Sequence, residues 1–128
     1  MTKEMKAVVY QVETGYSREW GFLPFHLFEQ KMKEESSSEK FNLTISKHTP
    51  VMETPISGDS HFGMLDNLFA LTNSPTGESD NLRTNFPKAH SLSVGDIVSL
   101  SNADENQFYY CNSFGWVEIN HEDLIEPV

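Results

Sequence analysis

The sequence contains little cysteine, few cationic side chains and no long apolar run. Cys111 is the single cysteine among 128 residues, so a disulfide within the chain is impossible. No segment approaches the ~20 consecutive apolar residues of a membrane-spanning helix, and residues 1–13 lack the apolar core of a secretory signal. We therefore expect a cytoplasmic protein that does not contact membranes.

The scarcity of cations is uneven along the chain. Nine Lys and Arg oppose 19 Asp and Glu, which gives a net charge of −10. Residues 41–128 hold twelve acids and three bases, a net charge of −9, whereas residues 1–40 hold seven acids and six bases. Nucleic acids and anionic membranes are bound through Lys and Arg, so direct binding to either is disfavoured. An acidic surface suits solubility, or a protein partner with a basic surface.

Recognisable catalytic and metal-binding motifs are also missing. The five histidines never occur at the His-x-His or His-x-x-x-His spacing of a metal site. No glycine-rich loop is followed by the lysine of a phosphate site. Cys111 lies beside two tyrosines in an expected strand, where a buried, inert thiol is favoured over a nucleophile. We therefore predict no catalytic residue, no cofactor and no metal ligand.

The sequence does contain enough apolar material for one core. Hydrophobic residues make up 38% of the chain, and they include nine Phe, four Tyr and two Trp. This length is typical of one domain, so we expect residues 1–128 to form a single α+β domain.

Hydrophobic periodicity predicts strands and two helices in the first part of the chain. Alternating apolar residues favour strands at 5–13 and 40–48, and the proline-containing segment 49–61 is expected to be a loop or an edge strand. A helix at 23–35 would begin at Pro24. The apolar stripes of this helix and of a second one are Phe25, Phe28 and Met32, and Leu65, Leu68, Phe69 and Thr72.

After a polar loop at 74–89, the chain is rich in strand signals. Segments 97–101, 108–111 and 116–119 indicate strands, and the sequences NADENQ and NSFG supply the turns between them. The expected fold class is α+β, with an antiparallel sheet that ends in a C-terminal three-stranded meander and with two amphipathic helices packed on it.

Two turn signals flank these strands. Gly95 precedes the first strand, where a residue without a Cβ permits a tight turn. The carboxylate of Asp96 can accept a backbone N–H of that turn. Residues 120–125 indicate one helical turn with Asn120 as its cap.

The segments LDNLFALTNSP, HSLSVGDIVSL and FYYCNSFGWVEI together resemble the YodL-like domain family over about residues 64–119. That pattern has a helix ending near Asn-x-Pro, a Ser-Leu-Ser-Val-x-Asp strand and a Tyr-Tyr hairpin with Gly-aromatic. The resemblance implies a small domain found in Gram-positive bacteria, often on conjugative elements and phages, and it implies no catalytic residue. The matching positions are Leu68, Asn73, Ser91, Leu92, Ser93, Val94, Asp96, Val98, Tyr109, Tyr110, Gly115 and Trp116.

Charge and resemblance together favour a binding protein over an enzyme. We expect a small acidic protein of a mobile genetic element or phage that contacts a partner with a basic surface. A Cas nuclease or a restriction enzyme fits this description, which suggests an anti-CRISPR or anti-restriction inhibitor. The residues expected to contact the partner are Asp104, Glu105, Tyr109, Trp116, Glu118 and Glu122.

Two alternative functions have weaker sequence signals. A hydrolase or nuclease would use His61 or His90 as an acid or base with nearby carboxylates, and a buried histidine with no open cleft would exclude it. An RNA-binding module would stack bases on an aromatic hairpin, although the flanking Lys and Arg of such platforms are missing. The aromatic residues of that hairpin are Tyr109, Tyr110, Phe114 and Trp116.

Overall fold

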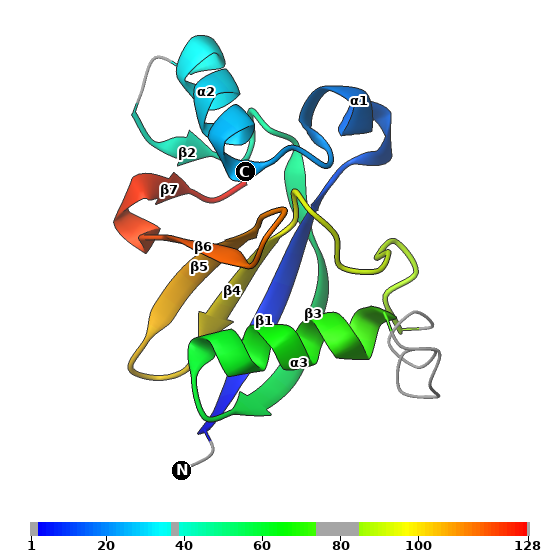
Figure 1. Ribbon diagram of the computed structural model, residues 1–128, viewed down its shortest axis with the longest axis vertical. Helices are drawn as coiled ribbons and strands as arrows, with labels where there is room; N and C mark the ends of the chain where they lie inside the picture. The colour runs from blue at the N-terminus through cyan, green and yellow to red at the C-terminus, as the bar shows by residue number, and fades with distance from the viewer. Residues whose placement is uncertain (1–2, 37–38, 74–84, 128) are drawn as a thin grey trace.

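The computed structural model describes residues 3–36, 39–73 and 85–127, and a five-stranded antiparallel sheet dominates it (Figure 1). The order of the strands is β3-β1-β4-β5-β6. A separate pair of short strands, β2 and β7, is parallel. The bounds are β1 (Lys3–Val12), β2 (Phe41–Asn42), β3 (His48–Gly58), β4 (Ile97–Ser101), β5 (Asn106–Cys111), β6 (Trp116–Ile119) and β7 (Leu124–Ile125).

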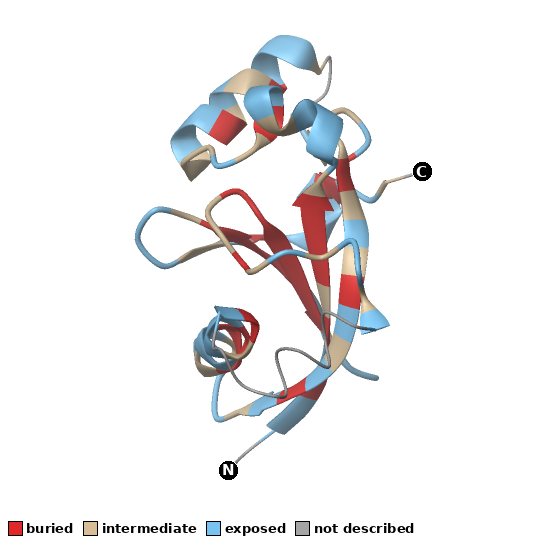
Figure 2. Ribbon diagram, turned by 90° about the vertical axis from the view of Figure 1, so that its right-hand side faces the viewer, coloured by how far each residue is buried: buried red, intermediate tan, exposed pale blue. Residues whose placement is uncertain are grey.

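Two longer helices cover opposite faces of the sheet. Successive side chains of a strand point to opposite faces. Val9 and Val98 pack with Leu68 of α3, whereas the neighbouring Tyr10 packs with Phe28 of α2. Strand β4 is consequently buried on both sides, while the outer surfaces of the helices stay exposed (Figure 2). The helices and helical turns are η1 (Thr14–Tyr16), α1 (Ser17–Trp20), α2 (Phe25–Glu35), α3 (His61–Asn73) and η2 (His121–Asp123).

The expected α+β class and the C-terminal meander are confirmed. Strands β4, β5 and β6 are adjacent and antiparallel. The turn before β4 has the predicted glycine conformation, because Gly95 has a φ of 99° and a Cβ there would lie 2.7 Å from the backbone nitrogen of Phe22. Asp96 accepts the backbone N–H of Ser93 at 3.0 Å, as its position in the turn predicted.

The predicted strand at 40–48 is wrong. Only Phe41–Asn42 forms a strand, and the chain then turns sharply before β3. The side-chain oxygen of Asn42 accepts the N–H of Thr44 at 3.0 Å, and Lys47 has a φ of 61°. Local side-chain hydrogen bonds of this kind compete with strand pairing, and they override the apolar alternation here.

The proline-containing segment forms the edge strand β3. The N–H of Cys111 in β5 donates to the carbonyl of Asp96, directly before β4. The alternation of antiparallel pairs can be followed from this bond across β4 and β1. It places Pro50 and Pro55 at positions whose backbone nitrogens point away from β1. Proline costs no ladder hydrogen bond at such positions, so the edge alternative of the prediction is correct.

The helix predictions need smaller corrections. Helix α2 begins at Phe25, and Pro24 is the cap residue before it. Phe69, which was counted in the apolar stripe of α3, is 39% exposed. Asn120 precedes η2 but makes no side-chain capping hydrogen bond. Most of the predicted polar loop, residues 74–84, lies outside the described residues.

Candidate functional site

One flank of helix α3 faces the β5–β6 hairpin across a groove. Phe62, Asp66 and Phe69 share that flank because they follow one another at i, i+4 and i+7. All three are exposed, and Asp66 and Phe69 line a hollow of about 340 Å³ whose opposite wall includes Cys111 and Trp116. We call this surface the α3–β6 groove and define it by Phe62, Asp66, Phe69, Tyr109, Cys111, Trp116 and Glu118.

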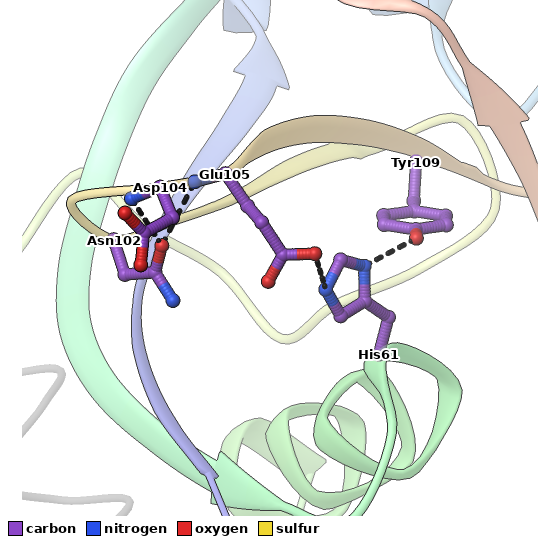
Figure 3. A network of polar contacts seen from close by, with 5 residues as sticks. All are labelled: His61, Asn102, Asp104, Glu105 and Tyr109. Atoms are coloured by element: carbon purple, nitrogen blue, oxygen red, sulfur yellow. Dashed lines mark hydrogen bonds and ion pairs between the residues drawn. The ribbon is translucent and has the colours of Figure 1, made fainter.

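His61, the first residue of α3, lies between Tyr109 and Glu105 (Figure 3). Its Nδ1 lies 2.6 Å from the hydroxyl oxygen of Tyr109, and its Nε2 lies 3.7 Å from Oε1 of Glu105. The ring of Phe62 packs edge-on against the same tyrosine, with 5.6 Å between the ring centroids. The helix, the turn before β5 and β5 itself therefore meet at this histidine.

Two hydrogen-bonded turns position this cluster. Ser60 caps α3, because its hydroxyl accepts the N–H of Gly63 at 3.0 Å. In the β4–β5 turn, the side-chain oxygen of Asn102 accepts the N–H groups of Asp104 and Glu105, both at 2.8 Å. Figure 3 shows the result: the side chain of Glu105 reaches toward the histidine, whereas that of Asp104 does not.

The electrostatics of this cluster oppose catalysis by Tyr109. Burial, followed by repulsion from Glu118 and Glu105, raises the pKa of Tyr109 to about 12. When the carboxylate of Glu105 faces the Nε2–H of neutral His61, the protonated tyrosine donates its hydrogen bond to Nδ1. Both ring nitrogens then have protein partners, so the cluster joins β5 and the turn before it to α3.

Burial also shifts the pKa values of two further side chains, Cys111 and His48, so that each stays neutral near pH 7. Burial raises the pKa of the Cys111 thiol to about 12, which is the opposite of what a nucleophilic thiolate needs. Burial lowers the pKa of His48 to about 4. Its neutral ring donates to the carbonyl of Gly95 and accepts from the hydroxyl of Ser46, each at 2.7 Å. Both side chains therefore serve the core.

His90 lies at a second polar cluster, at the far end of β1. Its backbone N–H donates to Oε1 of Gln11 at 3.0 Å, and Nε2 of Gln11 donates to Oδ2 of Asp96 at 2.9 Å. Burial raises the pKa of Asp96 to about 6, although hydrogen bonds from Gln11 and Ser93 partly offset this shift. Asp96 is thus engaged in holding the turn before β4 and does not form an acid–base pair with the histidine.

Two larger hollows differ from the α3–β6 groove in the charges on their walls. Glu13 and Lys88 line one of about 620 Å³, and the ion pair of Lys6 with Glu53 lines another of about 560 Å³. The charged residues at the groove are all acidic. Within the part of the chain that the structure describes, no group of three His, Cys, Asp or Glu side chains could hold a metal ion.

The structure brings four of the six predicted contact residues together at the groove. Tyr109 and Glu118 are cross-strand neighbours, Trp116 lies one pair further along the same face, and Glu105 reaches the histidine beside them. Tyr109 is 3% exposed, because its ring packs against Phe62 and its hydroxyl is bonded to His61. The other two residues are exposed on the β4–β5 turn and on η2: Asp104 and Glu122.

Sequence reasoning did not identify the helical wall of the groove. A signal for it existed, because Phe62, Asp66 and Phe69 form a second stripe beside the buried stripe of Leu65 and Leu68. The sequence did not show which neighbour this second stripe faces. The carboxylate that lies beside His61 is Glu105, which is distant in the sequence.

Comparison with known proteins shows the family of this chain. Among the described residues, no helix is long and apolar enough to cross a membrane. No curated protein and no solved structure matches the chain. The family model of the YodL-like domain matches residues 6–121, from within β1 to the start of η2, which is wider than the expected 64–119. The chain therefore belongs to the YodL-like domain family.

Proposed function

We propose that this YodL-like protein is a non-enzymatic binding protein whose α3–β6 groove contacts a basic surface on another protein. The observation that carries the proposal is the sign of the charge around the groove. Asp66, Glu105 and Glu118 border it, and neither α3 nor the chain from β4 onward contains Lys or Arg. Such a surface creates a negative field that speeds encounter with a cationic partner.

Exposed aromatic residues supply the apolar part of the same surface. Phe62 is 50% exposed, Phe69 borders the hollow, and Trp116 is half-buried in its opposite wall. Phe114, at the tip of the β5–β6 hairpin, is 94% exposed. Aromatic side chains with an acidic rim are typical of protein contact surfaces, where large rings supply most of the binding energy.

A host defence enzyme with a basic nucleic-acid cleft is the partner that we propose. The occurrence of the resembled family on conjugative elements and phages supports this choice, as does the acidic surface. A Cas nuclease or a restriction enzyme has such a cleft, and its inhibition would place the protein in the cytoplasm of the host. The proposal includes no direct binding to nucleic acid and no cofactor.

The alternative functions have less support. His61 gains a carboxylate neighbour, but the pKa values of Tyr109 and Cys111 are raised, so the described part of this site holds no activated nucleophile. An RNA platform would need exposed rings beside cations. Tyr109 and Tyr110 are buried, and no Lys or Arg follows Lys88.

Affinity capture from the native host, followed by kinetics with the purified partner, tests the proposal. One variant replaces Asp104, Glu105, Glu118 and Glu122 with Asn or Gln. We expect its fold to persist, because exposed surface changes cost little. Its association with the captured partner should be slower by about tenfold or more at low salt, with a weaker dependence on ionic strength.

A matched control removes the same number of charges from the other side of the molecule. It replaces Glu13, Glu19, Glu34 and Glu35, which are exposed near α1 and on α2, with Gln. This variant should associate almost as fast as the wild type. Equal association rates for all three proteins would contradict the electrostatic mechanism and leave solubility as the role of the acidic surface.

A further inference from the structure

We propose that the partner is bound as an added β-strand on the outer edge of β6, an inference that rests on the proposed function. β6 is the last strand of the sheet and pairs with β5 alone, whereas β3 lies at the opposite end (Figure 1). None of the described residues pairs with the outer side of β6. An unpaired strand edge is a template for a segment of another chain.

The alternation of the ladder identifies the free backbone groups. In β5, the N–H of Cys111 donates to the carbonyl of Asp96, directly before β4, at 2.8 Å, so Tyr110 directs its backbone groups toward β6 and pairs with Val117. By the same alternation, the N–H and C=O groups of Trp116 and Glu118 point outward. These groups offer a short extended segment two pairs of backbone hydrogen bonds.

The side chains on this edge specify the chemistry of the segment. Trp116 and Glu118 point to the groove side of the sheet, and Val117 points to the other side. Arg beside Glu118 would form a cross-strand ion pair, and Arg over Trp116 would form a cation–π contact. An apolar residue would lie beside Val117. The structure therefore fits an extended segment that alternates Arg or Lys with β-branched apolar residues.

A peptide probe tests strand addition directly. The probe is a short acetylated peptide of alternating Arg and Val, and its control has the same side chains but N-methyl groups on alternate backbone amides. The control keeps the charge and loses the hydrogen bonds to β6. We expect the probe to bind about tenfold or more tightly than the control, since each lost hydrogen bond costs about that factor.

Amide hydrogen exchange by NMR locates the binding site. In the free protein, the amide of Val117 should already be protected, whereas those of Trp116 and Glu118 should exchange fast. The unmethylated probe should slow exchange at Trp116 and Glu118 by at least about tenfold at saturation. This alternating pattern distinguishes a backbone ladder from side-chain contact.

A pair of variants separates the backbone of Glu118 from its charge. Glu118→Gln and Glu118→Pro both lose the carboxylate, but only the proline variant also loses the outward N–H. We expect Glu118→Gln to bind the probe a few-fold more weakly than the wild type. Glu118→Pro should bind about tenfold more weakly again, and protection of the Val117 amide should confirm that it is folded.

The outcomes separate this inference from the proposed function. Equal binding of both peptides, without protection at Trp116 and Glu118, would overturn strand addition and leave binding to a basic partner intact. A captured partner that binds through the acidic residues but leaves these amides unprotected would overturn it as well. If the cationic probe does not bind at all, an Arg- and Val-containing strand on β6 is ruled out. The association kinetics with the captured partner would still test whether the protein binds a basic surface.

Discussion

The two outer strands of the sheet present very different edges to their surroundings. β3 is eleven residues long, and its outward backbone positions are interrupted by Pro50 and Pro55. Glu53 also lies on β3, where it pairs with Lys6 at 3.6 Å. Prolines and charges are the usual protection of a free edge against pairing with other chains. β3 is therefore closed to strand addition in two places.

The β6 edge lacks prolines, and its one charged side chain is the exposed carboxylate of Glu118. It is four residues long and contains neither proline nor lysine, and its outward positions are Trp116 and Glu118. The side chains of Trp116 and Glu118 lie on the groove side of this edge. A strand from a basic partner that paired with β6 would also contact both side chains. The difference between the edges indicates that pairing is prevented at β3 and permitted at β6. Three predictions test this comparison.

The largest expected effect separates inward from outward positions within β6. Val117→Pro removes an N–H that bonds to β5 and should lower the free energy of unfolding by about 3 kcal/mol or more. Glu118→Pro removes an outward N–H and should cost about 1 kcal/mol or less. Chemical denaturation of both variants measures these values. A larger loss at position 118 would mean that the register assigned to the edge is wrong.

The second prediction concerns the centre of the sheet, which holds both edges in place. Native Asp96 keeps its proton up to about pH 6, whereas an ordinary aspartate loses it near 3.8. The folded state therefore binds more protons in this window, so the Asp96 contribution to stability falls as pH rises. His48 acts in the opposite direction, because its pKa is lowered from 6.5 to about 4 and its contribution rises with pH.

Asp96→Asn isolates the first of these contributions. The amide oxygen can still accept from Gln11 and Ser93, but it does not titrate. The free energy of unfolding of the wild type, minus that of the variant, should decrease by about 2 kcal/mol between pH 4 and pH 6. Urea denaturation at several pH values measures it. A difference that is constant or increases with pH would contradict the burial of an uncompensated carboxyl group.

The smallest effect is expected at the β3 edge. Pro55→Thr restores an N–H that points outward, so the free energy of unfolding should change by less than about 1 kcal/mol. Self-association at high concentration should increase a few-fold, because a longer free edge becomes available. Size-exclusion chromatography with light scattering measures this, and Pro127→Thr, outside the sheet, is the control. The same self-association in both variants would show that Pro55 does not protect the edge.

Local patterns predicted the parts of the fold that depend on neighbouring residues. The meander from 97 to 119 was predictable because each strand alternates and polar turns separate the strands. The φ of 99° at Gly95 follows the same logic, since a tight turn before a strand excludes most side chains. The strand predicted at 40–48 was wrong, because apolar alternation does not indicate that the side chain of Asn42 bonds to the backbone of Thr44.

Composition and short-range periodicity were enough to predict the acidic charge, its concentration after residue 40, the amphipathic helices and the C-terminal strands. Tertiary structure alone decided which flank of α3 faces β6 and that His61 meets Glu105 and Tyr109. It also decided the raised pKa of Asp96, since burial is set by residues far apart in the chain. Pairing across the sheet likewise decided which edge is open, because a strand shows its outward groups only once its neighbour is known.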